Sequence, residues 1–409
     1  MAFERIAARS GSKALASFFA TGAFLLAGGL GVAHAGCGEV YKPGRHVTKI
    51  EADGVERSAV YYVPSSYTGK EKVAVVFDFH GSNSNPEGQL TRSSWDRVAE
   101  KNGFIAVALQ GSISGKSPGT FAWNVPFVEV SKSVIPHGGQ GGLDEIAFID
   151  DAVDEVKEDF CIDPNRIFAS GYSGGGRMLS AYLCAGGDDF VAAGFVNSLR
   201  AGRPVEADGK WTPEKANCSP AKPISIMAFA GEKDGQNPYA GGGSAYWQYG
   251  FKTAIQRWTD MDGCTGNGTS ETVNGVTYGV YGTCKNGARI ASYVFANGTH
   301  DWPKPTEKDT VIAAATESAN GVVKVSAVAK KPSFDANVDP ASRMWDFFGK
   351  ADSTDVVATA AQPKALNSAK IGAAVAGDCM ATDDAQGMTC SNDQQNELRR
   401  SGQGAKGAL

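Results

Sequence analysis

The sequence predicts an α/β fold in which a mostly parallel central sheet is covered by helices on both faces. Short apolar runs rich in Val, Ile and Phe are typical of buried strands. Segments with a helical repeat of apolar residues lie between several of these runs, as a parallel sheet with crossover helices requires. The 409 residues, 42% of them hydrophobic and 20% charged, suffice for a large core. We place this fold in one domain over residues 36–350.

The chain opens with the pattern of a secretory signal peptide, which we assign to residues 1–35. Three basic residues precede an apolar run over residues 14–32, and Ala-His-Ala at 33–35 fits a cleavage site. A transmembrane anchor is an alternative, but glycines dilute the run and no basic stop-transfer cluster follows. In a third interpretation Cys37 is the lipid-bearing first residue of a lipoprotein, although such signals normally carry an aliphatic residue at the position of His34. We therefore expect an extracellular or periplasmic protein that is free of the membrane once the signal is removed.

The predicted strands share a high content of β-branched and aromatic residues. They cover residues 58–63, 73–80, 104–109, 166–170, 191–197, 224–230 and 289–295. Residues 144–160 form the clearest predicted helix, because apolar side chains recur there at steps of three and four residues. Further helices are expected over 177–184, 245–261 and 340–348.

The composition changes after residue 350. From 351 to 409 the chain has no aromatic residue and is dominated by small and polar side chains. Such a segment cannot build a core of its own, so we predict a flexible C-terminal tail.

Charge and cysteine content exclude several classes of function. The net charge of −5 provides no basic field for nucleic acid, so we expect no nucleic-acid partner. All 8 cysteines follow the predicted signal, and an even number in an exported chain indicates disulfides. Zinc is the alternative, but no C-x-x-C or H-x-x-x-H spacing occurs. We expect no metal and no cofactor.

The motif G-x-S-x-G, which marks a serine nucleophile on a sharp turn between a strand and a helix, occurs twice. At residues 115–119 no strand precedes the motif, and Pro118 has no N–H where an oxyanion hole needs one. At residues 171–175 the motif follows a predicted strand and leads into a predicted helix. We therefore predict Ser173 as the nucleophile.

A serine nucleophile needs a general base, and His300 is the candidate. The order Ser, then Asp, then His is expected for this kind of turn, and all other histidines precede Ser173. His300 also lies just after the predicted strand 289–295.

Asp234 is the predicted acid that orients this base. It follows the apolar strand 224–230, so it lies at a strand end like the other two residues. Glu232 is a competing carboxylate two positions earlier.

The negative charge that develops on a carbonyl oxygen needs preorganised N–H donors. The backbone N–H of Gly174, directly after the nucleophile, is one candidate. Ser82, after the strand 73–80, offers the second, and Gly81 permits a close approach. We expect His80 to support this loop.

These residues resemble those of secreted α/β-hydrolase esterases, the family that groups feruloyl esterases, acetyl xylan esterases and poly(3-hydroxybutyrate) depolymerase-like proteins. The likeness covers residues 37–350 and rests on His-Gly-Ser at 80–82, the segments 161–166 and 171–175, Gly231-x-x-Asp234, and Gly-Thr-His-Asp-Trp-Pro at 298–303. Thr299 and Ala230 depart from the pattern, which has Gly and His there. The resemblance implies disulfides Cys37–Cys161, Cys184–Cys218 and Cys264–Cys284, and leaves Cys379 to pair with Cys390.

The predicted function is that of a secreted, metal-independent serine esterase that forms an acyl-enzyme on feruloyl or acetyl esters of plant cell walls or on hydroxyalkanoate oligomers. A depolymerase of poly(3-hydroxybutyrate) and a catalytically silent binding protein are the alternatives. The tail has no aromatic side chain to stack on a polymer surface, which favours small or oligomeric esters as the partner. Trp302 and Trp123 are the candidate substrate-binding residues, whereas core packing is the expectation for Trp247 and Trp258.

Overall fold

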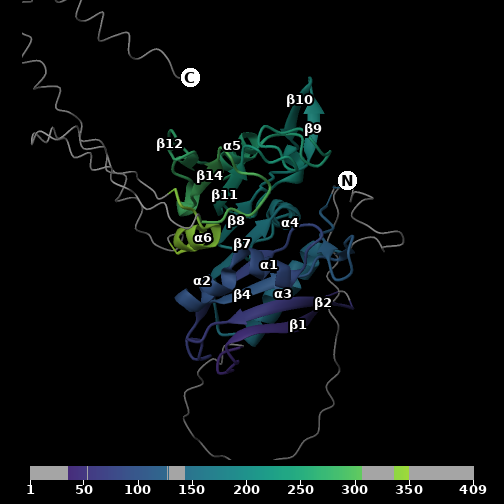
Figure 1. Ribbon diagram of the computed structural model, residues 1–409, viewed down its shortest axis with the longest axis vertical. Coiled ribbons are helices and arrows are strands. Elements are labelled where there is room, and N and C mark those ends of the chain that lie inside the picture. Colours follow the sequence, from purple (N-terminus) through teal and green to yellow (C-terminus); the bar gives the residue numbers. More distant parts are fainter. Residues whose placement is uncertain (1–35, 53, 127, 129–142, 306–335, 350–409) are drawn as a thin grey trace, which may run out of the picture.

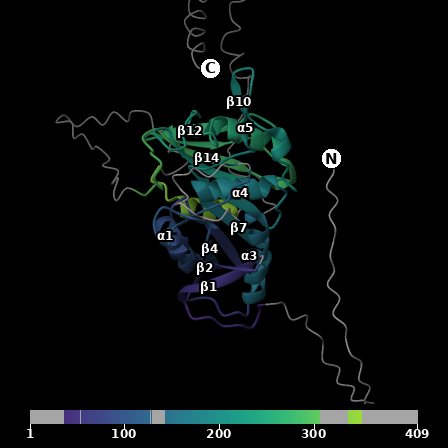
Figure 2. The same cartoon turned by 90° about the vertical axis from the view of Figure 1, so that its right-hand side faces the viewer.

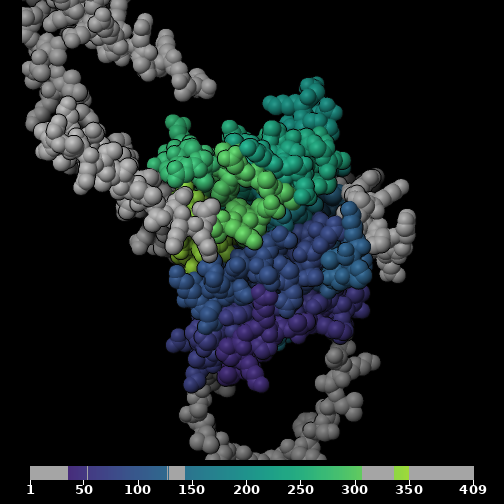
Figure 3. Space-filling view, viewed as in Figure 1, coloured from purple at the N-terminus to yellow at the C-terminus, as the bar shows by residue number. Residues whose placement is uncertain are grey.

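A computed structural model describes residues 36–349, except 53, 127, 129–142 and 306–335 (Figure 1). The predicted signal peptide, the predicted tail, and Cys379 and Cys390 lie outside the described residues. Figure 3 shows residues of the first half of the chain, in purple and blue, meeting green residues of the second half across the middle of one face.

One sheet of 10 strands organises the molecule, in the order β1-β2-β4-β3-β7-β8-β11-β14-β13-β12. Its strands are β1 (Gly44–Ala52), β2 (Val55–Val63), β3 (Val73–Phe79), β4 (Ile105–Leu109), β7 (Ile162–Tyr172), β8 (Ala192–Val196), β11 (Ser225–Gly231), β12 (Thr269–Val273), β13 (Val276–Val280) and β14 (Ile290–Phe295). The six central strands from β4 to β14 are parallel, and the two strands at each edge are antiparallel to their neighbours. This strand order is that of the α/β-hydrolase fold, so the predicted fold class is confirmed.

Helices cover both faces of this sheet, as Figure 2 shows for α1 on one side and α3 on the other. Helices α1 (Pro86–Ser93), α2 (Trp95–Asn102) and α6 (Pro340–Phe348) pack on one face, and α3 (Glu145–Asp159), α4 (Gly174–Cys184) and α5 (Phe251–Met261) pack on the other. Side chains of β3 alternate between the two: Phe77 and Phe79 join the core with α3 and α4, whereas Val76 joins the core with α1 and α2.

Short elements complete the described part of the chain. They are the hairpin of β5 (Ile113–Ser114) and β6 (Phe121–Ala122), the hairpin of β9 (Pro204–Ala207) and β10 (Lys210–Pro213), and the single turns η1 (Lys215–Asn217) and η2 (Lys285–Gly287).

The structure differs from the sequence prediction mainly at the edges. Strand β1 was not predicted, because its outward residues alternate with inward ones and only its end is buried. Helix α1 was not predicted either, although Asn85 caps it by accepting from the Gly88 N–H and Pro86 occupies its first turn. Helix α5 begins at Phe251, not at residue 245, because Gln248 has a positive φ of 22° and Gly250 is extended, so the backbone directly before Phe251 is not helical.

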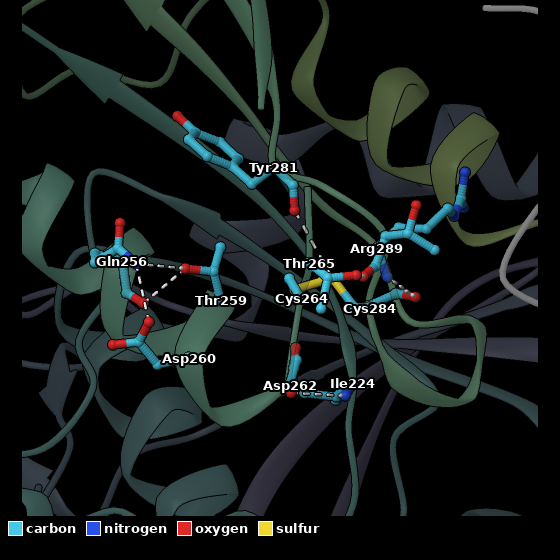
Figure 4. Close-up of a disulfide and its surroundings, with 12 residues drawn as sticks. Ile224, Gln256, Thr259, Asp260, Asp262, Cys264, Thr265, Tyr281, Cys284 and Arg289 are labelled. Carbon is cyan, nitrogen blue, oxygen red and sulfur yellow. Dashed lines mark hydrogen bonds between the residues drawn. A yellow bond between two sulfur atoms is a disulfide. The ribbon is translucent and has the colours of Figure 1, made fainter. Parts of the chain in front are cut away.

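Three disulfides connect these elements. The structure pairs Cys37 with Cys161, Cys184 with Cys218, and Cys264 with Cys284, which are the pairs that the family resemblance implies. The last of these joins the segment after α5 to the segment before β14 (Figure 4). Each bond limits the freedom of the unfolded chain, which stabilises the folded one.

Asp262, beside the Cys264–Cys284 disulfide, is a buried carboxylate with one weak partner. Its Oδ1 accepts from the Ile224 N–H at 3.3 Å (Figure 4), whereas its Oδ2 has no hydrogen-bond partner among the described residues. Burial raises the pKa of Asp262 to about 7. The folded protein therefore holds a proton that the unfolded chain releases near pH 4, so this contribution to stability is lost as the pH rises toward 7.

We expect Asp262→Asn to remove this pH dependence. Between pH 4 and 7 the free energy of unfolding of the variant should rise relative to wild type by up to about 1.4 kcal/mol per pH unit. Denaturant unfolding at pH 5 and pH 8 measures the difference, with Asp260→Asn, an exposed neighbour, as the matched control. If the free energies of unfolding of Asp262→Asn and wild type differ by the same amount at pH 5 and at pH 8, the pKa of Asp262 is not raised as described.

Candidate active site

Ser173 occupies a sharp turn between β7, which ends at Tyr172, and α4, which begins at Gly174. Its φ of 50° and ψ of −115° lie outside the conformations that a serine normally adopts. Glycines make the turn possible. A Cβ on Gly171 would lie 2.5 Å from the Cα of Gly176, and one on Gly175 would lie 2.2 Å from the carbonyl oxygen of Phe79. The geometry explains why the motif has glycine on both sides of the serine.

The structure brings Ser173, His300 and Asp234 together from three strand ends. His300 Nε2 lies 2.8 Å from Ser173 Oγ, and His300 Nδ1 lies 2.8 Å from Asp234 Oδ2. Ser173 and His300 are each 9% exposed and Asp234 is 4% exposed, so the serine and the histidine lie nearer to solvent than the carboxylate. A carboxylate only accepts hydrogen bonds, so Nδ1 carries the proton and Nε2 accepts from the serine hydroxyl.

Backbone donors fix the Asp234 carboxylate. Its Oδ1 accepts from the N–H groups of Gln236 and Asn237, each at 2.8 Å, which directs Oδ2 to His300. Glu232, the competing carboxylate, is exposed to solvent. The acid that contacts the histidine is therefore Asp234.

Ser82 and Gly174, the two predicted oxyanion donors, lie side by side. A Cβ on Gly174 would lie 3.0 Å from the Ser82 nitrogen. Neither backbone N–H donates a hydrogen bond to any residue that the structure describes. Two free donors beside Ser173 suit a carbonyl oxygen that gains negative charge.

His80 holds the loop that carries Ser82. Its Nδ1 donates to the Gly81 carbonyl at 2.7 Å, and its Nε2 accepts from the Gly111 N–H at 3.0 Å. Burial lowers the pKa of His80 to about 4, so the ring is neutral at pH 7. The expected supporting position of His80 agrees with these contacts.

The two tryptophans predicted to bind substrate are largely enclosed. Trp123 is 3% exposed, and its Nε1 donates to the His80 carbonyl at 2.8 Å, which places it behind the Ser82 loop. Trp302 is 4% exposed and packs against Tyr172 at the edge of an open hollow that Arg92 and Lys304 also line. These contacts support a positioning role for Trp123 and leave only the edge of Trp302 to meet a ligand.

Asn197, which the sequence analysis did not single out, connects the loops of the base and the acid. Its Nδ2 lies 3.0 Å from the His300 carbonyl and 3.1 Å from the Asp301 carbonyl, and its Oδ1 accepts from the Gly231 N–H at 3.2 Å. Tyr172 adds a hydroxyl that donates to the same His300 carbonyl at 2.8 Å. Asn197 is the last residue of the predicted strand 191–197, and each of the three predicted catalytic residues follows a predicted strand, so the position at a strand end was the available signal.

The part of the chain that the structure describes holds no group of three or more His, Cys, Asp or Glu residues placed to bind a metal ion. No helix within that part is long and apolar enough to cross a membrane.

Comparisons with known proteins identify relatives of the chain, although no family model matches it. It is 26% identical over 250 residues to feruloyl esterase B of Piromyces equi, and 24% identical over 276 residues to a probable feruloyl esterase C of Aspergillus oryzae. A probable acetylxylan esterase A of Aspergillus fumigatus is 22% identical over 262 residues. The chain is related to feruloyl and acetylxylan esterases.

The matches to these esterases cover 60%, 66% and 61% of this chain, respectively. The chain spans only 42% of the Piromyces equi protein, but 84% of the Aspergillus oryzae one and 67% of the Aspergillus fumigatus one. Among solved structures, an acetyl xylan esterase from Aspergillus awamori superposes with a TM-score of 0.40 at 13% identity, over 63% of this chain and 95% of that chain. The assignment of the fold rests on the strand order.

We expect Asn197→Gly to lower kcat for ester hydrolysis roughly 10- to 100-fold with little change in KM, because His300 loses its anchor to the acid loop. Glycine accepts the φ of 52° at this position, so the loss reflects the missing amide. Asn274→Gly is the matched control, since Asn274 has a φ of 51° in the exposed turn between β12 and β13. A kcat equal to wild type for Asn197→Gly would refute the positioning role.

Proposed function

We propose that the protein is a serine carboxylesterase that hydrolyses its substrate through an acyl-enzyme. The observation that carries this proposal is the continuous chain of hydrogen bonds from Ser173 through His300 to Asp234, with two free backbone N–H groups beside the serine. The names of the esterase relatives support the same reaction class.

In the first half of the reaction Ser173 Oγ attacks the ester carbonyl while its proton moves to His300 Nε2. The carbonyl oxygen becomes negative and accepts hydrogen bonds from the N–H groups of Ser82 and Gly174. His300 then gives the proton to the leaving alkoxide as the C–O bond breaks. The products of this half are a free alcohol and an ester of Ser173.

In the second half a water molecule repeats these steps. His300 Nε2 takes a proton from water as the water oxygen, now equivalent to hydroxide, attacks the acyl carbon of the Ser173 ester. The proton returns to Ser173 Oγ as the acyl group leaves as a carboxylic acid. Asp234 stabilises the positive imidazole in both halves and is itself never protonated.

Feruloyl or acetyl esters of plant cell-wall polysaccharides are the substrates we favour, because proteins with those names are the relatives of the chain. We further propose that the protein acts outside the cytoplasm. The three disulfides support this placement, since such bonds persist in oxidising compartments.

Ser173→Ala should abolish ester hydrolysis, whereas Ser117→Ala should leave it nearly intact. Both serines lie in a G-x-S-x-G motif, but Ser117 is exposed in the loop between β5 and β6, where its backbone forms hydrogen bonds with Thr120 and none of the described histidines forms a hydrogen bond with it. Steady-state hydrolysis of 4-nitrophenyl acetate and labelling by a fluorophosphonate probe measure the effect, with Ser117→Ala as the matched control. Equal turnover by Ser173→Ala and wild type would overturn the proposed function.

Asp234→Asn should lower kcat more than 100-fold, because an amide at this position no longer favours the productive tautomer of His300. Glu232→Gln removes the same charge two residues away and should have little effect. Melting temperatures of both variants establish that they fold. The assignment of the acid is wrong if Glu232→Gln loses more activity than Asp234→Asn.

A further inference from the structure

A cavity of about 450 Å³ lies beside α4 and is separate from the hydrogen bonds of the candidate active site. Val125 and Pro126 border it on one side, just after Trp123, which contacts the Ser82 loop. Arg177, Ala181 and Cys184, which lie on one face of α4, border it on another. The cavity therefore lies between the helix that starts at the nucleophile and the segment behind the oxyanion donors.

The cavity lies close to Ser173 along α4. Ser173 directly precedes the helix with a non-helical φ of 50° and ψ of −115°, so its relation to Arg177 is given by the backbone. The Arg177 N–H donates to the Ser173 carbonyl at 3.1 Å, so the two residues are one helical turn apart, about 5.4 Å along the axis. A ligand in the cavity could thus extend to Ser173.

Arg177 is the unusual side chain in this cavity. It is only 9% exposed, yet no hydrogen bond or ion pair joins its guanidinium to any described residue, and its Nε is enclosed without a partner. The guanidinium instead stacks over the ring of Tyr246, whose centroid lies 4.1 Å from its Cζ. Stacking uses the flat face of a guanidinium and leaves the N–H groups at its edge free to donate.

A second buried cation lines the same cavity. Arg200, 6% exposed, donates to the carbonyls of Trp247 at 2.6 Å and Tyr249 at 2.9 Å, so its bonds are to neutral groups. Burial chiefly, and the charge of Arg177 in addition, lower the pKa of Arg200 to about 10. The two guanidinium groups are therefore close enough to repel each other, and none of the described residues that line the cavity is a carboxylate.

Two neighbouring buried cations without an anion are costly, because each has lost water and gained no counter-charge. A bound carboxylate would correct this deficit, since the planar fork of Arg177 matches a carboxylate. Apolar residues, among them Val125, Val128 and Ile146, make up most of the remaining lining and suit a hydrocarbon or aromatic chain. Its other polar members are Ser180, Asn217 and Arg203, and Arg203 is paired with Glu214.

We propose that this cavity binds the ionised carboxyl group of an ester substrate, with Arg177 as the direct donor and Arg200 as a supporting charge. This inference rests on the proposed function and narrows it to esters with a second, anionic end. The carboxylate could belong to the acyl part of the ester or to the alcohol part, and the chemistry at Arg177 is the same for both.

The test compares esters that differ only in this charge. On the acyl side, 4-nitrophenyl hydrogen adipate is paired with 4-nitrophenyl hexanoate, and on the alcohol side 4-acetoxybenzoate is paired with its methyl ester. Wild type should show at least a tenfold higher kcat/KM for the anionic member of one pair. The pair that shows the preference identifies the side of the ester that enters the cavity.

Arg177→Met should reduce that ratio of kcat/KM values at least tenfold. Arg166→Met removes the same charge from the first half of β7, where the Arg166 side chain is 38% exposed and pairs with Asp163, and should leave the ratio unchanged. If Arg177→Met does not fold, Arg177→Gln serves in its place. A ratio that is the same in wild type and in the Arg177 variant, or no preference in either pair, would overturn the inference.

Direct binding separates this inference from the proposed function. Titration calorimetry with adipate and with 4-acetoxybenzoate on Ser173→Ala, and on Ser173→Ala with Arg177→Met, requires no turnover. Binding of either probe that is lost with Arg177 supports the site even if wild type hydrolyses neither pair. If neither probe binds, or if binding persists without Arg177, the cavity is not the proposed site, whereas hydrolysis of the neutral esters would still support the proposed function.

Discussion

The candidate site depends on how closely α4 approaches the end of β3. Gly175, in the first turn of the helix, lies where any Cβ would meet the carbonyl oxygens of Phe79 and His80 at 2.2 and 2.5 Å. This contact fixes the distance between the Ser82 loop and Ser173, because one follows β3 and the other precedes α4. A bulkier residue would push the helix away and separate the two N–H groups that lie beside the serine.

A buried polar cluster close to this contact joins the neighbouring strands β3 and β7. Asp78 of β3 accepts from Ser170 of β7 at 2.7 Å, from Ser93 of α1 at 2.7 Å and from Gln89 of α1 at 3.0 Å. Burial raises the pKa of Asp78 to about 6, although these three donors oppose that shift. The strand ends that carry Ser82 and Ser173 therefore rest on a shared carboxylate as well as on apolar packing.

The central strands and the order of the predicted catalytic residues could be read from the sequence because both are local. Apolar runs such as 73–80 are buried on both faces, and the turn at Ser173 needs glycines at fixed positions. Strand β1 and helix α1 could not be read in this way, because β1 is buried only at its end and Leu90 is the one aliphatic side chain among the buried residues of α1. Asn197 and Arg177 were missed for a related reason. The strand-end position of Asn197 was the one local signal. An amide that joins two loops, and a guanidinium with no hydrogen-bond partner among the described residues, become visible only when packing brings their surroundings together.

The pairing of the disulfides affects how they can form while the chain emerges during synthesis or export. Cys37 pairs with Cys161, Cys184 with Cys218, and Cys264 with Cys284. Counted along the chain, the first of these cysteines pairs with the second, the third with the fourth and the fifth with the sixth. The three covalent rings are consecutive and none crosses another. A polypeptide that emerges with its N-terminus first therefore presents each cysteine with its native partner before any later cysteine is available. Oxidation in step with emergence would yield these three bonds directly, without the slow exchange of partners that interlocked pairings require.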